Sequence, residues 1–301
     1  MTNGARVTHK IISIGEVLWD LLPDGEQLGG APANFACHAA IQGADVVMLS
    51  AVGDDRRGHD ALRILSSYGI ETGLMQIVSG VPTGTVGIEL DSDGKPAFTI
   101  HEGTAWDQLA WSEELASRIS SADAIVFGTL GQRSETARAT IQRALATAEA
   151  AGVNRVVDIN LRPPFFDVGV IRDSLQSANI LKLSDDELAE ACAACAVATS
   201  DDEEAMIRGL LEFADLDAVV LTRGAQGAMV VTRTETVQQN AVQTNVVDTV
   251  GAGDAFTATF LAGFLGNQPH EENLSKACAV AAAACMHSGA VPGLPNDQNE
   301  T

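Results

Sequence analysis

Short apolar runs alternate with longer stretches of helical periodicity along most of the chain. The run that starts at Lys10 is apolar and ends in a glycine, which is typical of a central strand. Further strands are expected at residues 45–53, 123–127, 155–159, 179–183, 218–222 and 229–232. Helices are expected at residues 30–42, 58–69, 134–151, 185–196, 201–213, 256–265 and 273–288. This alternation predicts an α/β protein whose mostly parallel sheet carries helices on both faces.

One part of the chain departs from this pattern. Within residues 81–102, Val86 and Ile88 alternate with small or polar residues before a predicted turn at residues 91–95. Alternation on both sides of a turn is typical of a β-hairpin. Together with residues 16–28, which proline and glycine interrupt, the hairpin would form a small sheet that projects from the main body.

A glycine turn at residues 251–253 follows an extended run at residues 241–247, which is expected to be a strand, and precedes a buried helix. Small residues there let backbone N–H groups at the start of the helix face a ligand, and the helix dipole adds positive potential. Asp254 lies in the same turn, where a carboxylate can take a proton from a hydroxyl. An anion site beside a base indicates phosphoryl transfer. The structural alternative is a tight turn whose acidic residue only complements the dipole.

Two other phosphate-binding motifs do not occur in the sequence. No Gly-x-x-x-x-Gly-Lys-Ser/Thr pattern is found, and Phe256 stands where a dinucleotide fingerprint needs glycine or alanine. These observations exclude a P-loop enzyme and a Rossmann dehydrogenase.

The composition restricts the partners further. The 301 residues are enough for one large α/β domain or two small ones, and 46% of them are hydrophobic and 4% aromatic. The formal net charge is −22, so we expect neither nucleic acid nor an anionic membrane as a partner. No run is long and apolar enough to span a bilayer, and the first residues show no signal-peptide core. Cys192 and Cys195 have a redox-like spacing, but their alanine-rich surroundings favour ordinary buried thiols and a reducing, cytoplasmic compartment.

Two segments resemble a known family. Residues 248–256, Asp-Thr-Val-Gly-Ala-Gly-Asp-Ala-Phe, are similar to the C-terminal signature of the ribokinase-like (PfkB) sugar kinases. Residues 29–34, Gly-Gly-Ala-Pro-Ala-Asn, resemble the N-terminal signature of the same family. The resemblance implies a three-layer ribokinase-like fold, with one kinase domain over residues 1–301. It also implies that strands at about residues 16–28 and 81–104 form a lid over the sugar.

The resemblance implies a reaction and a set of site residues as well. In an ATP-dependent kinase, Asp254 would be the base, and the backbone amides of Gly251, Ala252 and Gly253 would stabilise the moving phosphoryl group. The residues implied for the acceptor sugar are Asp20, Gly29, Gly30, Asn34, Arg162 and Asp254. The residues implied for the nucleotide are Lys182, Thr222, Gly224, Gly227, Gly251, Gly253 and Ala283.

The cofactors implied by the resemblance are ATP and Mg²⁺. Glu187 stands where the family pattern Asn-x-x-Glu has the glutamate that organises hydrated Mg²⁺, although Ser184 replaces the asparagine. The alternative for Glu187 is a first-turn carboxylate that complements a helix dipole. Many relatives also use K⁺ near the loop that corresponds to Asp248, so activation by K⁺ is an open question.

Several acceptors fit the resemblance. Gly15-Glu16, the Ser184 segment and residues 128–132 are most similar to bacterial fructokinases, which make fructose 6-phosphate. 2-Keto-3-deoxygluconate kinase is the second alternative, with Arg162 as partner of the acceptor carboxylate. Ribokinase and nucleoside kinase follow, and a sugar-binding regulator without catalysis is a further alternative because fold alone does not prove chemistry. Relatives often dimerise through the lid sheet, so the oligomeric state is open between monomer and homodimer.

Overall fold

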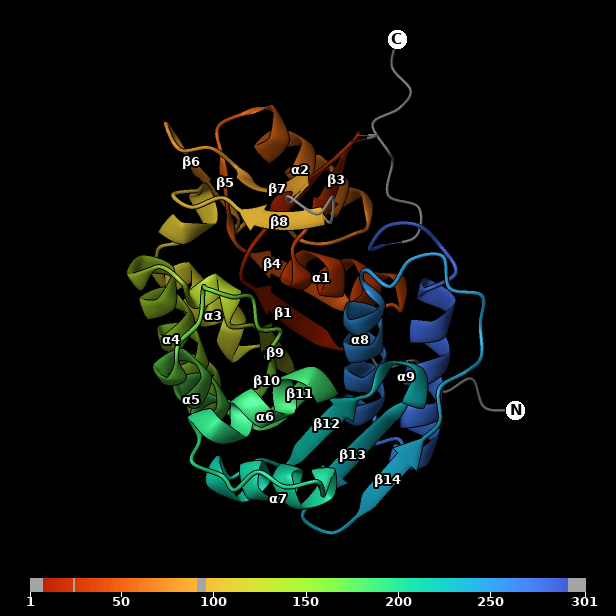
Figure 1. The fold of residues 1–301 in the computed structure, drawn as a ribbon. Coiled ribbons are helices and arrows are strands. Elements are labelled where there is room, and N and C mark those ends of the chain that lie inside the picture. The colour runs from red at the N-terminus through yellow and green to blue at the C-terminus, as the bar shows by residue number, and fades with distance from the viewer. Residues whose placement is uncertain (1–7, 24, 91–95, 292–301) are drawn as a thin grey trace, which may run out of the picture.

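The computed structural model describes residues 8–23, 25–90 and 96–291. Its centre is an eight-stranded sheet in the order β14-β13-β12-β11-β10-β9-β1-β4 (Figure 1). The strands from β12 to β4 are parallel, and β13 and β14 run antiparallel at one edge. The bounds of these strands are β1 Lys10–Ile14, β4 Asp45–Leu49, β9 Ala124–Phe127, β10 Asn154–Asp158, β11 Ile180–Ser184, β12 Ala218–Thr222, β13 Ala228–Thr232 and β14 Thr236–Gln239.

Helices cover both faces of the sheet and give the molecule three layers (Figure 1). Ile125 of β9 belongs to the core beneath α3, α4, α5, α6 and α7, whereas its neighbour Val126 belongs to the core beneath α1, α2, α8 and α9. Successive side chains of a strand point to opposite faces, so one apolar run supplies both cores. The helices are α1 Ala31–Ile41, α2 Arg56–Ser67, α3 Glu113–Ser120, α4 Glu135–Ala150, α5 Val168–Ser177, α6 Asp185–Ala194, α7 Glu203–Phe213, α8 Ala252–Leu265 and α9 His270–Ala284.

A second sheet of four strands, in the order β3-β2-β7-β8, lies across one end of the main sheet (Figure 1). Strands β2 and β7 are parallel, and the two outer pairs are antiparallel. This confirms the predicted small sheet, and we call it the lid. The predicted turn at residues 91–95 lies outside the described residues. The lid strands are β2 Leu18–Leu22, β3 Gly25–Gly29, β7 Gly84–Leu90 and β8 Pro96–Ile100.

Two strand predictions are wrong in part. Residues 45–53 form two strands, β4 and β5 (Ala51–Gly53), because β5 leaves the main sheet and pairs with β6 (Gln76–Val78).

Residues 241–247 are not a strand. Val246 and Val247 are 62% and 66% exposed, and the N–H of Val247 donates to the carbonyl of Cys285 at the end of α9. The alternation of valines in this segment therefore does not reflect a sheet face. Much of the segment borders a cavity instead, as described below.

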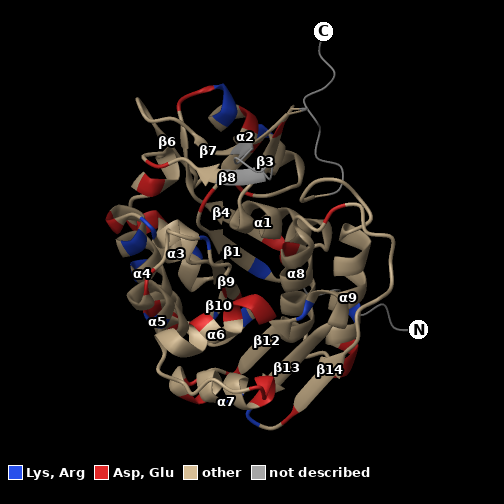
Figure 2. Ribbon diagram, viewed as in Figure 1, with Lys and Arg blue, Asp and Glu red and all other residues tan. Residues whose placement is uncertain are grey.

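Acidic residues occur on helices of both layers, and they are present in the first turns of α6 and α8 (Figure 2).

In the parts of the chain that are described, no helix combines the length and the hydropathy that a membrane crossing requires.

Candidate active site

Helix α8 begins in a turn that requires glycine at position 251. Gly251 has a φ of +76°, in the left-handed region, and a Cβ there would lie 2.0 Å from the carbonyl oxygen of Ala290. A side chain would therefore clash with backbone, which has no flexible end to move. The turn sets the positive end of the α8 dipole beside the carboxyl ends of β10 and β11, where an anion is favoured.

Some of the first backbone N–H groups of α8 are free to bind a ligand. The N–H of Ala252 donates to the carbonyl of Thr249 at 3.3 Å. The N–H groups of Gly253 and Asp254 make no hydrogen bond within the described residues, as expected for the first turn of a helix. Gly253 also allows a close approach, because a Cβ at this position would lie 3.3 Å from Nζ of Lys182. The start of α8 therefore offers two free N–H groups, and the ammonium group of Lys182 lies close to Gly253.

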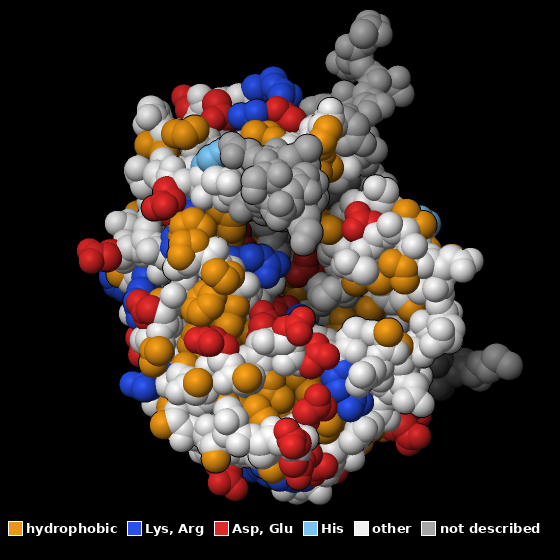
Figure 3. All heavy atoms as spheres, viewed as in Figure 1, with side chains coloured by type: hydrophobic (Ala, Val, Ile, Leu, Met, Phe, Trp, Pro, Cys, Tyr) orange, Lys and Arg blue, Asp and Glu red, His pale blue; other side chains and the backbone are white. Residues whose placement is uncertain are grey.

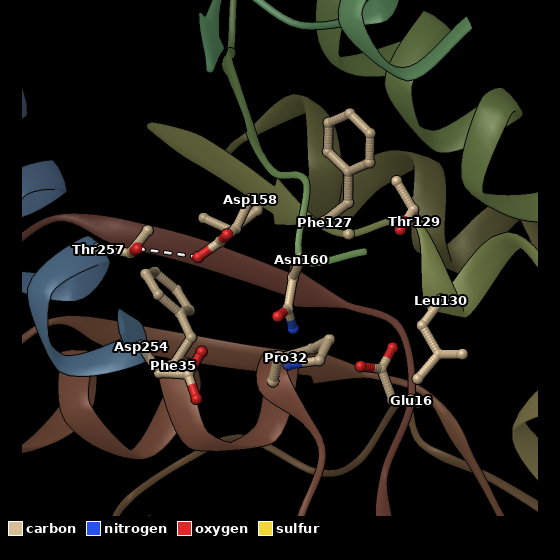
Figure 4. A pocket seen from close by; sticks show the side chains of 13 residues that line it. Glu16, Pro32, Phe35, Phe127, Thr129, Leu130, Asp158, Asn160, Asp254 and Thr257 are labelled. Carbon is tan, nitrogen blue, oxygen red and sulfur yellow. Dashed lines mark hydrogen bonds between the residues drawn. The ribbon is translucent and has the colours of Figure 1, made fainter. Parts of the chain in front are cut away.

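Asp254 lies in the first turn of α8 and lines a cavity with its carboxyl group (Figure 4). Burial raises its pKa to about 7, and the negative charge of Asp158 adds to this effect. A hydrogen bond from Asn34 and the charge of Lys182 act in the opposite direction. A carboxylate whose pKa is near 7 is suited to general-base catalysis at neutral pH.

A buried ion pair joins two neighbouring strands beside the start of α8. Lys182 of β11 donates from Nζ to Oδ1 of Asp158 of β10 at 3.0 Å, and the two residues are register partners in the sheet. Thr257 of α8 donates to Oδ2 of Asp158 at 3.0 Å. Burial disfavours the ammonium group, but the nearby carboxylates of Asp158 and Glu187 outweigh burial and raise the pKa of Lys182. Lys182 is therefore a fixed positive charge at the carboxyl edge of the sheet.

A cavity of about 730 Å³ opens between the lid and this edge, and it is visible as a hollow in the surface (Figure 3). We call it the acceptor cavity. Leu18 and Val86 of the lid contribute apolar side chains to its wall. Of the residues predicted from the sequence, the structure brings to this cavity Asp20, Gly30, Asn34, Arg162, Lys182, Asp248, Gly251, Gly253 and Asp254.

The glycine pair before α1 shapes the acceptor cavity in two ways. Gly29 does not line it, but a Cβ at this position would lie 2.5 Å from Oδ2 of Asp20. Gly30 has a φ of +101°, and a Cβ there would lie 2.5 Å from the carbonyl oxygen of Glu16. Burial raises the pKa of Asp20 to about 6, against the positive charge of Arg162.

A second cavity, of about 600 Å³, lies on the other side of the α8 start, and we call it the nucleotide-side cavity. It shares Lys182, Thr249 and Gly253 with the acceptor cavity, so the two spaces meet there. Among the residues predicted for the nucleotide, it is lined by Lys182, Thr222, Gly224, Gly227 and Gly253.

Ala283 is not among the residues that line this cavity, and its contact with the nucleotide stays a prediction. Ala283 is exposed, whereas Ala281, Ala282 and Cys285 line the nucleotide-side cavity. An α-helix has 3.6 residues per turn, so only the alanines on one face of α9 can contact a ligand in this cavity. The sequence predicts the helix but not which of its alanines face the cavity.

Glu187 has a structural role in the first turn of α6. Its Oε2 accepts hydrogen bonds from the N–H and the hydroxyl of Ser184 in a capping box, and its Oε1 accepts from the N–H of Leu161 at 2.7 Å. It lines neither of the two cavities. The role of Glu187 in holding hydrated Mg²⁺ stays a prediction. Within the described residues no group of three or more His, Cys, Asp or Glu side chains could hold a metal ion.

Asp248 joins two loops at the rim of the acceptor cavity. Its Oδ1 accepts from the N–H of Val250 at 3.0 Å, and its Oδ2 accepts from the N–H of Gly289 at 2.9 Å. These bonds hold Val250, which precedes Gly251, and Gly289, which precedes the Ala290 carbonyl that lies against Gly251. A K⁺ site near Asp248 stays a prediction.

The sequence reasoning did not assign roles to Glu16, Asp158 and Asn160, which all line the acceptor cavity. Glu16 is 2% exposed, and burial raises its pKa to about 7. Each of the three residues lies at or just after the carboxyl end of a buried parallel strand. That position is the signal that could have identified them, because ligands gather at this edge.

We expect the buried carboxyl groups to make stability fall as the pH rises. The pKa of Glu16 in the folded chain is about 7, above its ordinary value of 4.5, so between these values the folded state binds more protons than the unfolded state. Replacing Glu16 by Gln should therefore raise the Tm at pH 8.5, by an amount on the order of 5 °C. The gain should nearly vanish at pH 5. Thermal unfolding at both pH values measures it.

The matched control for this experiment is Glu212→Gln, an exposed residue of α7. We expect it to change the Tm equally little at both pH values. A gain for Glu16→Gln that does not depend on pH would contradict the assigned cause.

Comparison with known proteins places this geometry in a family. The sequence model of the pfkB family carbohydrate kinases matches residues 23–297. The chain belongs to this family. Membership of this family makes the protein a sugar kinase. It also confirms the family resemblance predicted from residues 29–34 and 248–256.

Curated relatives match this pfkB kinase over nearly its whole length. Fructokinase-2 of Solanum lycopersicum is 29% identical over 97% of this chain and 95% of its own. The fructokinase of Klebsiella pneumoniae is 30% identical over 95% of this chain and 96% of its own.

Solved structures confirm the ribokinase-like fold of the pfkB kinase. A fructokinase with bound ATP from Xylella fastidiosa superposes with a TM-score of 0.84, at 24% identity and over 96% of both chains. An aminoimidazole riboside kinase from Salmonella enterica, complexed with its riboside and an ATP analogue, has a TM-score of 0.79 at 23% identity, over 95% of this chain and 97% of its own.

Proposed function

We propose that this pfkB kinase transfers the γ-phosphoryl group of ATP to a primary hydroxyl of fructose, giving fructose 6-phosphate. One observation supports this most strongly. Asp254 lines the acceptor cavity directly after Gly253, which borders both cavities, and the N–H groups of Gly253 and Asp254 are free. Lys182 also borders both cavities. A base and an anion site at one point are what phosphoryl transfer to a hydroxyl requires.

The roles of the residues follow from this arrangement. Asp254 takes the proton of the attacking hydroxyl, and its pKa of about 7 suits that transfer. The free N–H groups of Gly253 and Asp254, at the positive end of α8, stabilise the negative charge that develops on the phosphoryl oxygens. Lys182, held by Asp158, faces both cavities and adds a positive charge at the point of transfer.

ATP and Mg²⁺ are the cofactors of the proposed reaction. A sugar kinase from Pyrococcus horikoshii has been solved with ATP, and a ribokinase II from E. coli with ATP and Mg²⁺. In this chain, Thr222, Gly224 and Gly227 border the space where the nucleotide would lie. Mg²⁺ would neutralise charge on the phosphates, with Glu187 as the residue proposed to organise its water.

The charges of the acceptor cavity support a neutral sugar. Five carboxylate residues line this cavity, namely Glu16, Asp20, Asp158, Asp248 and Asp254, and Arg162 and Lys182 are the basic side chains among its lining residues. An acceptor that carries a carboxylate would meet more like than unlike charge there. The names of the curated relatives, fructokinases in every case reported above, support the same acceptor.

A second candidate is 2-keto-3-deoxygluconate kinase, and one observation favours it. Arg162 is exposed at the acceptor cavity and has no carboxylate within ion-pair distance among the described residues. Its guanidinium group, which donates to the carbonyl of Leu161, is free to bind a carboxylate.

A coupled ADP-release assay tests the proposed function. We would assay ATP, Mg²⁺ and K⁺ with fructose, 2-keto-3-deoxygluconate, ribose, glucose and adenosine. Turnover with fructose at a kcat/KM about tenfold or more above the others is the expected result. Preference for the keto acid would keep the mechanism and make Arg162 the residue that binds the carboxylate. No turnover with any acceptor, combined with sugar binding, would favour the regulator without catalysis.

A homodimer through the lid stays a prediction. Strands β3 and β8 are the edges of the lid sheet, so either could pair with a second copy. Light scattering on the purified protein would distinguish a dimer from a monomer.

A further inference from the structure

Glu16 has a buried carboxyl group, and one of its oxygens lacks a hydrogen-bond partner among the described residues. It lies two residues after the end of β1, and its Oε2 has no hydrogen-bond partner within the described part of the chain. The backbone N–H groups of Ala31 and of Glu16 itself donate to its carboxyl group. An unpaired buried carboxyl oxygen costs free energy, so its presence needs a reason.

The surroundings of Glu16 supply few donors. Besides the acceptor cavity, Glu16 lines a small cavity of about 20 Å³ whose wall includes Pro32, Phe127 and Leu130 (Figure 4). These three side chains carry no hydrogen-bond donor. Thr129 and Thr257 of the same wall donate their hydroxyl protons elsewhere, to the carbonyl of Ile159 and to Asp158. Gly131 leaves space on another side, since a Cβ there would lie 3.5 Å from Oε2. A molecule in the acceptor cavity can supply the donor that this oxygen lacks within the described residues.

Asn160 lies between Glu16 and Asp254. Figure 4 shows the two carboxyl groups on opposite sides of its side chain, which points into the space between them. Asn160 has a φ of +39°, a left-handed conformation that is uncommon for a residue other than glycine and is often found at functional sites. All three residues also line the much larger acceptor cavity, so a polyol there can contact Asp254 with one hydroxyl and Glu16 with another.

We propose that Glu16 is a substrate-binding residue that accepts a hydrogen bond from a second hydroxyl of the acceptor sugar, distinct from the hydroxyl that is phosphorylated. This rests on the proposed function, in which a sugar fills the acceptor cavity. A sugar that lacks the second hydroxyl would leave the buried oxygen unpaired. Sites built in this way discriminate strongly against such analogues, so Glu16 contributes to the choice of acceptor.

Calorimetric titration of the full-length chain tests the proposal without requiring turnover. The titrants are fructose and its 1-deoxy, 3-deoxy and 4-deoxy analogues, in the absence of nucleotide and at pH 8.5. We expect the wild-type protein to bind one of these analogues about 10- to 100-fold more weakly than fructose. Glu16→Gln should bind fructose more weakly by a similar factor and should lose most of the discrimination against that analogue, as coupled partners do in a double-mutant cycle.

Two further variants distinguish the loss of the sugar contact from the loss of the negative charge and from an effect on folding. Glu16→Asp keeps the charge but withdraws the carboxyl group from the cavity, so it should also bind fructose weakly. Glu212→Gln, on the surface of α7, should bind all four sugars as the wild type does. The Tm of Glu16→Gln should not fall below that of the wild type, whereas a merely structural role would lower it.

Three outcomes would overturn the proposal. The first is equal binding of every sugar by the wild type and Glu16→Gln, and the second is full fructose binding by Glu16→Asp. The third is a uniform loss of binding by Glu16→Gln with its discrimination unchanged. Failure of the kinase function is distinguishable from all three, because it appears as sugar binding with the expected pattern and no release of ADP.

Discussion

Asp254→Asn is expected to lower kcat for the best acceptor by about 10³-fold or more. Asparagine has almost the same shape as aspartate, so it fits the first turn of α8 and keeps a polar contact with Asn34. Its amide cannot accept the proton of the attacking hydroxyl. The coupled ADP-release assay measures the loss of kcat, and sugar titration should show that affinity for the acceptor changes far less.

The control for this variant is Asp45→Asn. Asp45 is exposed at the start of β4, at the amino end of the parallel strands and away from both cavities. It should keep the kcat of the wild type. If Asp254→Asn stays within about tenfold of the wild-type kcat, Asp254 is not the base and the proposed mechanism fails.

The order of the elements could be predicted because strands and helices differ in the spacing of their hydrophobic residues. Apolar runs buried on both faces, such as the one that starts at Lys10, differ clearly from amphipathic helices such as the one at residues 134–151. The alternating valines of residues 241–247 led to a wrong strand prediction. Alternation shows that successive side chains have different surroundings, but it does not show whether the segment pairs in a sheet or borders a cavity. Here the segment lines the nucleotide-side cavity.

The glycine turn could be predicted as a site because it is local. Gly251, Gly253 and Asp254 are neighbours in the sequence, so their joint position follows from one turn and one helix start. The ion pair between Lys182 and Asp158 could not be predicted in the same way. It depends on the register between β10 and β11, which the connections and the packing of both faces determine.

Glu16 shows a second limit of reasoning from sequence. Its residue type suggests an exposed loop, because an unpaired carboxylate is seldom buried. The structure buries it to 2% exposure between β1 and α1. Positions where a local rule fails in this way are often functional, since the cost is accepted only where a ligand or a reaction uses the group.

Gly251→Ala is expected to lower kcat by about 10²- to 10³-fold and to lower the Tm as well. A Cβ at this position would lie 2.0 Å from the carbonyl oxygen of Ala290, and the φ of +76° disfavours any side chain. The turn must therefore shift, and with it the amides of Gly253 and Asp254 that face the phosphoryl group in the proposed mechanism. Thermal unfolding and the ADP-release assay measure the two effects on the same preparation.

Gly73→Ala is the matched control for the loss of a glycine. A Cβ at position 73 meets no atom within 4 Å, and its backbone is not in the left-handed region. The same chemical change should therefore leave both the Tm and kcat unchanged, because it adds neither a clash nor strain. A Gly251→Ala protein with the Tm and the kcat of this control would show that the α8 turn tolerates a side chain. In that case the rigid anion site would no longer explain catalysis, and the charge of Lys182 would have to stabilise the phosphoryl group alone.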